Sequence, residues 1–317
     1  MPAVATDAVQ RRPRILVIKL GALGDFVQAM GPAAAIRRHH AGAEIVLLTT
    51  KPFADLARDC PYFDKVWLDE RPRLTDPASV LRLRRRLRDG GFVRVYDLQT
   101  SDRSSFYYHL MAPGKRPEWS GIARFASHPH DNPGRDAMHT LDRQADQLRR
   151  AGIAGVPTPD LSWAARDVTR FGVPEPYVLL IPGGSAHRPE KRWPVAQFAA
   201  LASRLAAAGV TPVAIGGPGE AALGAAIAAA CPQTRDLTGR TGFGEIVGLA
   251  SRAHRTVGND TGPMHLAVAG GSPATVLYSA ASDPALTAPR GRDVRILRRP
   301  RLDDLTVEEV AATLALD

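Results

Sequence analysis

Short apolar runs alternate with segments of helical periodicity along the first part of the chain. Continuous apolar runs of this length are typical of strands that are buried on both faces of a parallel sheet. The predicted strands are residues 14–20, 44–50, 65–68 and 93–98. The predicted helices are residues 26–39, 52–58 and 78–88. This alternation predicts a doubly wound α/β domain, in which helices cover both faces of a parallel sheet.

The pattern breaks off in the middle of the chain. Residues 114–136 are rich in Pro, Gly, His and Arg, and this composition predicts an irregular surface loop. A helix is predicted over residues 139–151. Residues 156–176 contain four prolines and show little periodicity. We therefore interpret residues 159–176 as a linker and hinge between two domains, with one short strand at residues 161–163.

A second unit of the same kind begins at residue 177. Its predicted strands are residues 177–181, 211–215, 255–257 and 275–278. Its predicted helices are residues 195–208, 220–230, 244–250, a helix that opens at 259–263 and runs to 269, and a closing helix at 307–316. The chain is therefore predicted to form two Rossmann-like domains, residues 13–158 and residues 177–304.

Composition agrees with this organisation. A chain of 317 residues fits two domains, and 44% hydrophobic residues are enough for each domain to bury a core. An aromatic content of 6%, with abundant alanine and glycine, favours α/β layers over an all-β sandwich. Cys60 and Cys231 lie far apart and have no CxxC spacing, so reduced thiols in the cytosol are expected.

The net charge of +9 is compatible with three kinds of partner: nucleic acid, an anionic membrane or a phosphorylated ligand. No nucleic-acid-binding motif accompanies the charge, so no nucleic-acid partner is expected. Five arginines in residues 82–88 lie on a predicted helix. They form either a solvated face above a buried stripe or a contact with an anionic membrane.

No apolar run approaches the roughly 20 residues that span a bilayer. Residues 1–14 contain no apolar stretch of signal-peptide type, and we interpret them as a short disordered lead. A cytoplasmic protein is expected, with peripheral contact to the inner face of a membrane as an open possibility.

The first chemical motif is KLGALGD, which runs from Lys19 to Asp25 after the first strand. Ligands of open α/β sheets bind at the carboxyl ends of the strands, where Asp25 is placed. The alternative is that Asp25 only caps a helix. Gly21 and Gly24 do not complete a GxGxxG pattern, so a dinucleotide fingerprint is absent.

The second motif joins the turn PGGS at residues 182–185 to KRWP at residues 191–194. Glycines, the Ser185 hydroxyl and the Lys191 ammonium suit a diphosphate. The alternative is a plain turn followed by an exposed basic cluster. The turn lacks the GKS or GKT ending of a P-loop, so ATPase chemistry is not implied.

The third motif is GNDTGPMH, residues 258–265, which opens a helix. A helix N-terminus offers free N–H groups and partial positive charge to a phosphate, and Thr261 and Gly262 are natural donors. The alternative is a helix capped by Asp260 or Thr261. No D-x-D pair occurs in the chain to hold a divalent metal on a diphosphate. Lysine, serine and helix-end N–H groups are therefore expected to neutralise the leaving group, without a metal or other cofactor.

Together, the three motifs resemble glycosyltransferase family 9, the bacterial ADP-heptose:lipopolysaccharide heptosyltransferases. The resemblance rests on KLGALGDFVQAMGPAAAIR, PGGSAHRPEKRWP and GNDTGPMHLA, which occur in this order across both domains. It implies the GT-B architecture: two Rossmann-like domains with the active-site cleft between them. It also implies that the final segment, residues 305–317, packs back on the N-terminal domain.

The resemblance implies roles for individual residues. Asp25 corresponds to the catalytic base. Donor-binding positions are Ser185, Lys191, Asp260, Thr261, Gly262 and His265. Gly184 is a further donor-binding position, and Gly217, Glu220, Thr241 and Phe243 are expected near the adenine. Acceptor-side positions are Lys19, Gly24, Gln99, Arg103 and His139.

The expected activity is an inverting, metal-independent transfer of heptose from ADP-heptose to a phosphorylated glycolipid acceptor of the lipopolysaccharide inner core, carried out by a monomer. Alternatives within the class are another nucleotide-sugar donor or a protein or glycan acceptor. A non-catalytic nucleotide-sugar-binding protein is a third possibility. An oxidoreductase with two Rossmann domains is disfavoured by the missing GxGxxG pattern.

Overall fold

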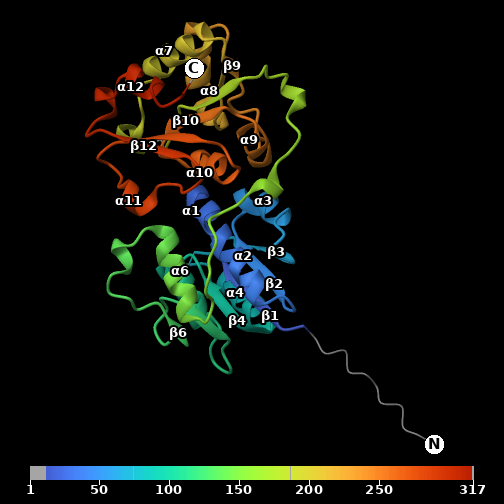
Figure 1. Cartoon of the computed structure of the whole chain (residues 1–317). Helices are drawn as coiled ribbons and strands as arrows, with labels where there is room; N and C mark the ends of the chain where they lie inside the picture. Colours follow the sequence, from blue (N-terminus) through green and yellow to red (C-terminus); the bar gives the residue numbers. More distant parts are fainter. Residues whose placement is uncertain (1–11, 74, 186, 316–317) are drawn as a thin grey trace, which may run out of the picture.

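The computed structural model describes residues 12–73, 75–185 and 187–315, so most of the lead expected at residues 1–14 lies outside the described residues. The described chain forms two α/β domains joined by an extended linker (Figure 1). Each domain has a six-stranded parallel sheet, with strand orders β3-β2-β1-β4-β5-β6 and β12-β11-β10-β7-β8-β9. The prediction of two Rossmann-like α/β domains is confirmed.

The N-terminal sheet is built from β1 (Arg14–Ile18), β2 (Glu44–Thr49), β3 (Lys65–Leu68), β4 (Phe92–Asp97), β5 (Glu118–Gly121) and β6 (His128–Pro129). Its helices are α1 (Leu23–Gln28), α2 (Met30–His39), α3 (Ala54–Arg58), α4 (Pro77–Asp89), α5 (Asp102–Leu110) and α6 (Thr140–Arg150). Short 3-10 turns are η1 (Lys51–Phe53) and η2 (Arg135–Ala137).

The C-terminal sheet is built from β7 (Tyr177–Ile181), β8 (Thr211–Ala214), β9 (Arg235–Asp236), β10 (Arg255–Asn259), β11 (Ala274–Tyr278) and β12 (Val294–Arg298). Its helices are α7 (Val195–Ala207), α8 (Ala221–Ala230), α9 (Phe243–Ala250), α10 (Gly262–Ala269), α11 (Pro284–Thr287) and α12 (Val307–Ala311). The 3-10 turns of the linker and this domain are η3 (Ser162–Ala164), η4 (Thr169–Phe171), η5 (Pro189–Lys191), η6 (Pro218–Glu220) and η7 (Leu302–Asp304).

Burial on both sheet faces explains the continuous apolar runs. In β1, Ile15 and Val17 pack into the cluster that contains the α1 and α2 side chains. Leu16 and Ile18 point to the opposite face and pack with side chains of α4 and α5. Because successive side chains of a strand point to opposite faces, a strand covered on both sides has to be apolar throughout.

Several local predictions differ from the structure. The segment 114–136 is not wholly irregular, because β5 and β6 extend the sheet and Trp119 is fully buried against Tyr108. The strand expected at residues 161–163 is the 3-10 turn η3. Just before this turn, the Leu161 N–H donates to the Ala269 carbonyl at 2.8 Å, at the end of α10, and so ties the linker to the C-terminal domain instead of to a strand.

The expectation that residues 305–317 pack on the N-terminal domain is wrong for the described part of that segment. The α12 helix lies against α7 of the C-terminal domain (Figure 1). Val307 and Val310 of α12, together with Leu314 just after the helix, are buried in the same cluster as Trp193 and Phe198. The helix α12 follows the C-terminal domain in the chain. Its apolar face is buried in that domain and completes the core there.

Two glycines bring the domains close together, because α1 packs against α10. A Cβ atom on Gly24 would lie 2.9 Å from Cδ2 of His265, and one on Gly262 would lie 2.7 Å from Cβ of Leu23. Distances this short exclude a side chain at either position unless the helices separate. The two chemical motifs that supply α1 and α10 therefore meet at the domain interface.

A Gly262→Ala substitution is expected to destabilise the protein by about 1–3 kcal/mol, as overpacking of a close contact does. Chemical denaturation followed by circular dichroism measures the effect. Gly42→Ala is the matched control, because a Cβ there meets nothing within 4 Å. Equal stabilities of the two variants would contradict the close helix contact.

A second contact between the domains joins α6 to the segment around α11. Nε2 of His139 lies 2.9 Å from the Ala288 carbonyl oxygen, and the Thr140 hydroxyl donates to the Leu286 carbonyl at 3.2 Å. Arg290 forms a two-pronged ion pair with Asp142, at 2.6 and 2.7 Å. These contacts fix α6 beside the cleft.

Candidate functional site

Two chambers lie in the cleft between the domains, and a third adjoins them within the N-terminal domain. The first chamber has a volume of about 1020 Å³, the middle chamber about 390 Å³ and the third chamber about 250 Å³. Thr261 lines both the first and the middle chamber. Asp25 lines both the middle and the third. The three chambers therefore form a row that leads from the C-terminal domain to the N-terminal domain.

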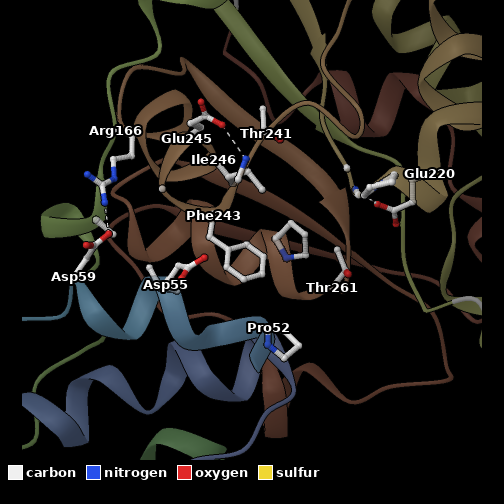
Figure 2. Close-up of a pocket in the computed structure, with 18 of the residues that line it drawn as sticks. Pro52, Asp55, Asp59, Arg166, Glu220, Thr241, Phe243, Glu245, Ile246 and Thr261 are labelled. Atoms are coloured by element: carbon white, nitrogen blue, oxygen red, sulfur yellow. Dashed lines mark hydrogen bonds and ion pairs between the residues drawn. The ribbon is translucent and has the colours of Figure 1, made fainter. Parts of the chain in front are cut away.

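The first chamber is walled by both domains (Figure 2). Asp55 and Asp59 reach it from the N-terminal domain, and Thr241 and Phe243 reach it from the start of α9. An aromatic ring among backbone groups and carboxylates suits the base and sugar of a nucleotide.

Glu220 holds the glycine turns of the first chamber together. Its carboxylate accepts the Gly184 N–H at 2.9 Å and the Gly217 N–H at 2.7 Å. Gly184, Gly217 and Glu220 all line the chamber. The carboxylate thereby ties the turn after β7 to the turn after β8, so Glu220 shapes the chamber wall.

The middle chamber contains a partly buried ion pair. Nζ of Lys191 lies 2.8 Å from Oδ2 of Asp260, and the Ser282 hydroxyl donates to the same oxygen at 2.8 Å. Burial opposes ionisation of Asp260, but the hydrogen bonds from Lys191 and Ser282 outweigh it and keep the pKa of Asp260 below its usual value. The pair aligns the Lys191 ammonium along the chamber wall.

The N-terminus of α10 opens into this chamber. Thr261 is the N-cap residue, and no side chain among the described residues caps the helix. Asp260, the other candidate cap, is engaged by Lys191 and Ser282. The structure therefore does not favour the capping alternative, and the first N–H groups of α10 are suited to an anion.

His265 lies one turn into α10 and is buried beneath the chamber. Burial lowers the pKa of His265 to about 4 and outweighs the opposing charges of Asp260 and Asp25. The imidazole is therefore neutral at physiological pH. Its Nδ1 atom has no hydrogen-bond partner among the described residues. A neutral ring in this position can donate or accept a hydrogen bond without adding charge.

The buried neutral His265 is expected to make the protein less stable in mild acid. The unfolded chain binds a proton near pH 6.5 and the folded protein only near pH 4, so stability falls as the pH drops through that window. The full loss is up to about 3 kcal/mol, at 1.36 kcal/mol per pKa unit.

Asp97 has the opposite effect on the pH dependence of stability. Burial raises its pKa to about 6, so the folded protein gains stability from Asp97 as the pH falls. The test is therefore the difference between wild type and His265→Asn in urea unfolding from pH 7 to 4. The variant should lose less stability than wild type over this range. His187→Asn, in an exposed loop, is the control. Parallel curves for wild type and His265→Asn would contradict a buried neutral imidazole.

Asp25 lies in α1, between the middle and third chambers. Its Oδ2 atom accepts the Ala22 N–H at 3.2 Å. Both interpretations of this carboxylate therefore hold at once, since it caps α1 and also lines the cleft. The hydrogen bond fixes the carboxylate relative to the cleft.

The third chamber lies at the carboxyl ends of β1 and β4. Lys19 is buried there and donates from Nζ to the Leu98 carbonyl at 3.1 Å. Burial lowers the pKa of Lys19, and the nearby charges of Asp25 and Asp97 oppose this effect. Gln99 also lines the chamber, and its Oε1 accepts the Leu20 N–H at 2.8 Å.

Most of the residues predicted to form the site therefore come together. Those that line the three chambers are Lys19, Gly24, Asp25, Gln99, Gly184, Lys191, Gly217, Glu220, Thr241, Phe243, Asp260, Thr261, Gly262 and His265. Gly24 belongs to the middle chamber and not to the acceptor side alone.

Three predicted residues lie elsewhere. Ser185 is exposed on its loop and lines none of the three chambers. Arg103 is exposed on α5 and borders a separate depression beside Pro72. His139 is buried, caps α6 by accepting the Leu141 N–H at 3.2 Å, and holds the domain contact described above. The contacts of His139 are therefore structural: the side chain caps α6 and joins the two domains.

Other lining residues were not predicted from the sequence. In the middle chamber these are Gln28, Arg188, Ser282, Asp283 and Thr287. In the third chamber they are Arg135, Asp136, Gln144 and Gln147, and Thr140 and Arg143 of α6 line this chamber as well. The one available signal was the polar spacing 140, 143, 144 and 147, which places four side chains on one helical face.

Few other features suggest further chemistry. Across residues 12–73, 75–185 and 187–315, no cluster of three or more His, Cys, Asp or Glu side chains could bind a metal. Within the same residues, no helix has the length and apolar character to cross a membrane. Cys60 and Cys231 are both buried and unpaired.

The arginine-rich helix of residues 82–88 is part of α4. In α4, the Arg86 guanidinium stacks over Trp67 at 4.5 Å, so at least this arginine packs against the domain.

Two Rossmann-like domains, with a carboxylate on one side of the cleft and a lysine and a helix N-terminus on the other, place the protein in the class with the GT-B architecture. Residues 80–312 match the family model of glycosyltransferase family 9 (heptosyltransferase). The chain belongs to this family, and the resemblance found in the sequence is confirmed.

Comparisons with individual proteins support the assignment to this family. The chain is 23% identical to the lipopolysaccharide core heptosyltransferase OpsX of Haemophilus influenzae, over 87% of this chain and 81% of that protein. It is similar in fold to ADP-heptose lps heptosyltransferase II of E. coli, with TM-score 0.78, 23% identity and coverage of 96% and 98% of the two chains. The E. coli heptosyltransferase WaaC with ADP gives TM-score 0.76 and 19% identity, with coverage of 94% and 98%.

Proposed function

We propose that this glycosyltransferase moves heptose from ADP-heptose to a sugar hydroxyl of a lipopolysaccharide inner-core acceptor, with inversion and without a metal. The observation that carries the proposal is the place of Asp25. It separates the middle chamber, which has the cationic and helix-end groups, from the third, which is polar and lies in the N-terminal domain. The known functions of the relatives OpsX and heptosyltransferase II support the choice of sugar and acceptor.

The donor would occupy the first and middle chambers. ADP fits the first chamber, with the base near Phe243 and Thr241. The diphosphate then lies at Thr261, which lines both chambers, within reach of the α10 N–H groups and Lys191. The heptose extends along the middle chamber toward Asp25. The WaaC neighbour, whose structure contains ADP, supports an adenine nucleotide.

The acceptor would enter through the third chamber and present a hydroxyl to Asp25. The carboxylate takes the hydroxyl proton as the new bond forms between the acceptor oxygen and the anomeric carbon of the donor. The bond from that carbon to the phosphate oxygen breaks, and ADP leaves with the electron pair. Lys191 and the α10 N–H groups stabilise the departing charge. Attack from the side opposite the leaving group inverts the anomeric configuration.

A direct test is the release of ADP from ADP-heptose, with and without a lipid A–Kdo acceptor extract, in the presence and absence of EDTA. Acceptor-dependent release that survives EDTA is the expected result, together with a product of inverted anomeric configuration. Release that stops in EDTA and returns with added metal would overturn the metal-independent step. No release, with ADP still bound, would move the assignment to another donor sugar or to a non-catalytic nucleotide-binding role.

A further inference from the structure

The middle chamber has one wall to which both domains contribute. Gln28 reaches it from α1 of the N-terminal domain, and Leu286 and Thr287 reach it from α11 of the C-terminal domain. The proposed function places the donor diphosphate on another side, beside Lys191 and the N-terminus of α10. The part of the transferred sugar that points away from the diphosphate would therefore meet the wall formed by α1 and α11.

Gln28 is a polar residue in this wall and is only 3% exposed. Its Nε2 atom donates to the Thr287 carbonyl at 3.1 Å, across the domain boundary. Because this bond uses the NH2 group of the amide, Oε1 is the other half of the carboxamide. No group in residues 12–73, 75–185 and 187–315 donates to Oε1. The Oε1 atom is therefore a free hydrogen-bond acceptor that Gln28 offers to a ligand in the chamber.

The place of Gln28 on α1 sets it close to the proposed reacting centre. Asp25 and Gln28 lie three residues apart on this helix, so their side chains share one helical face, and both line the middle chamber. Three residues of an α-helix rise about 4.5 Å, which is comparable to the width of one sugar ring. A sugar whose anomeric carbon lies beside Asp25 can therefore reach Gln28 with its far end.

The chain neighbour of Thr287 gives this wall an apolar part. Leu286 lines the chamber, and its carbonyl accepts the Thr140 hydroxyl at 3.2 Å, so the N-terminal domain fixes both residues of α11. An apolar side chain next to a free carboxamide oxygen matches a hydroxymethyl group. The methylene can pack on Leu286 while the hydroxyl donates to Oε1 of Gln28. A heptose carries one more carbon of this kind than a hexose.

We infer that Gln28 determines the specificity of this enzyme for a heptosyl donor, because its Oε1 atom accepts a hydrogen bond from the terminal hydroxymethyl group of the transferred sugar. The inference rests on the proposed function and sharpens it, since it names the residue that distinguishes a heptose from a hexose. Gln28 also holds α11 through the Thr287 carbonyl. The binding site for the hydroxymethyl group is therefore complete only while the two domains are in contact.

The test compares wild type and Gln28→Leu with two donors, ADP-heptose and ADP-mannose, whose hexose lacks the seventh carbon. Wild type should show the higher kcat/KM with ADP-heptose. In Gln28→Leu, kcat/KM should fall about tenfold more for ADP-heptose than for ADP-mannose, the equivalent of one hydrogen bond between uncharged groups. The affinity for ADP alone should not change, because Gln28 does not line the first chamber.

Asp142→Asn is the matched control for a loosened domain contact. It weakens the ion pair with Arg290, and Asp142 lines none of the three chambers. Any loss in this variant should be equal for the two donors. A Gln28→Leu variant that keeps the wild-type ratio of the two kcat/KM values would overturn the inference, as would a wild type with no preference. If Gln28→Leu does not fold, Gln28→Asn, whose amide is one methylene shorter, should show the same change in the ratio.

A binding measurement separates this inference from the proposed function. If wild type transfers neither sugar, the protein is titrated with ADP-heptose and with ADP-mannose by calorimetry. Tighter binding of ADP-heptose that is lost in Gln28→Leu supports the role of Gln28 even though the assigned transfer has failed. Equal affinity of wild type for the two donors, or a difference that the variant keeps, rejects the inference.

Discussion

Replacing Asp25 by asparagine is expected to lower the rate of acceptor-dependent ADP release by about 10²–10⁴-fold, the usual contribution of a general base. The affinity for ADP should remain unchanged, because the first chamber, where the nucleotide is placed, does not include Asp25. Steady-state turnover and calorimetric titration of ADP measure the two effects separately.

The asparagine variant should fold normally. Its side-chain oxygen can still accept the Ala22 N–H that caps α1 in the wild type. Asp102→Asn is the matched control, because Asp102 also lies in the first turn of an N-terminal-domain helix but outside the three chambers. Wild-type turnover in Asp25→Asn would reject the base assignment. A loss that also appears in Asp102→Asn would point to a general effect of removing a helix-end charge.

Replacing Lys191 by glutamine is expected to reduce turnover by about 10²–10³-fold, as the removal of one transition-state-stabilising group does. The ammonium is held at 2.8 Å from Asp260 and faces the middle chamber, where the departing diphosphate is placed. The loss should fall mainly on kcat, because negative charge develops on the leaving group in the transition state. Single-turnover kinetics with saturating donor measure this step.

Loss of Lys191 also leaves Asp260 buried with only the Ser282 hydrogen bond, so the variant should be less stable than wild type. Lys65→Gln is the matched control, because Lys65 pairs with Glu44 at 3.1 Å on the surface of the N-terminal domain. That exposed pair should contribute little to stability and nothing to turnover. A Lys191→Gln variant with normal kcat and a raised donor KM would assign Lys191 to uniform donor binding instead of transition-state stabilisation.

The sequence was sufficient for most parts of the site that lie within a single strand–turn–helix unit, with Ser185 after β7 as the exception. Asp25 after β1 and Thr261 and Gly262 at the start of α10 are placed by local chain direction. Strand ends and helix starts of parallel α/β units always meet at one edge of the sheet. The same local logic predicted both Rossmann-like domains, because burial on both sheet faces leaves continuous apolar runs in the chain.

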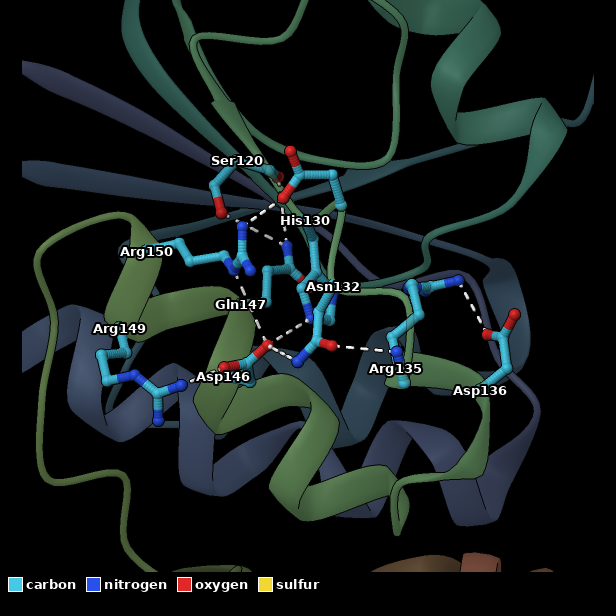
Figure 3. Close-up of polar contacts among 11 residues, drawn as sticks. Ser120, His130, Asn132, Arg135, Asp136, Asp146, Gln147, Arg149 and Arg150 are labelled. Atoms are coloured by element: carbon cyan, nitrogen blue, oxygen red, sulfur yellow. Dashed lines mark hydrogen bonds and ion pairs between the residues drawn. The ribbon is translucent and has the colours of Figure 1, made fainter.

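The sequence was less informative where a contact joins distant segments. Gln147 lines the third chamber because its side chain donates to the Ser120 carbonyl (Figure 3) and to the Asp97 carbonyl, and α6 is also held against the α11 segment by Thr140 and Asp142. The loop 114–136 became a chamber wall through Asp146 and Asn132, which have no motif of their own. Likewise, the apolar face of α12 was visible in the sequence, but not the surface that it covers.

Residue order alone was therefore enough to establish the fold class, the family and most of the chemical groups that line the first and middle chambers. Those features depend on periodicity and on short-range backbone geometry. Only the tertiary structure decided the packing of α12, the structural position of His139, the place of Arg103 outside the cleft and the polar wall of α6. Each of these depends on which remote surface a segment meets. A periodic pattern within one segment can show which face is polar or apolar, as in α6 and α12, but the partner of that face is chosen by the packing of the whole chain.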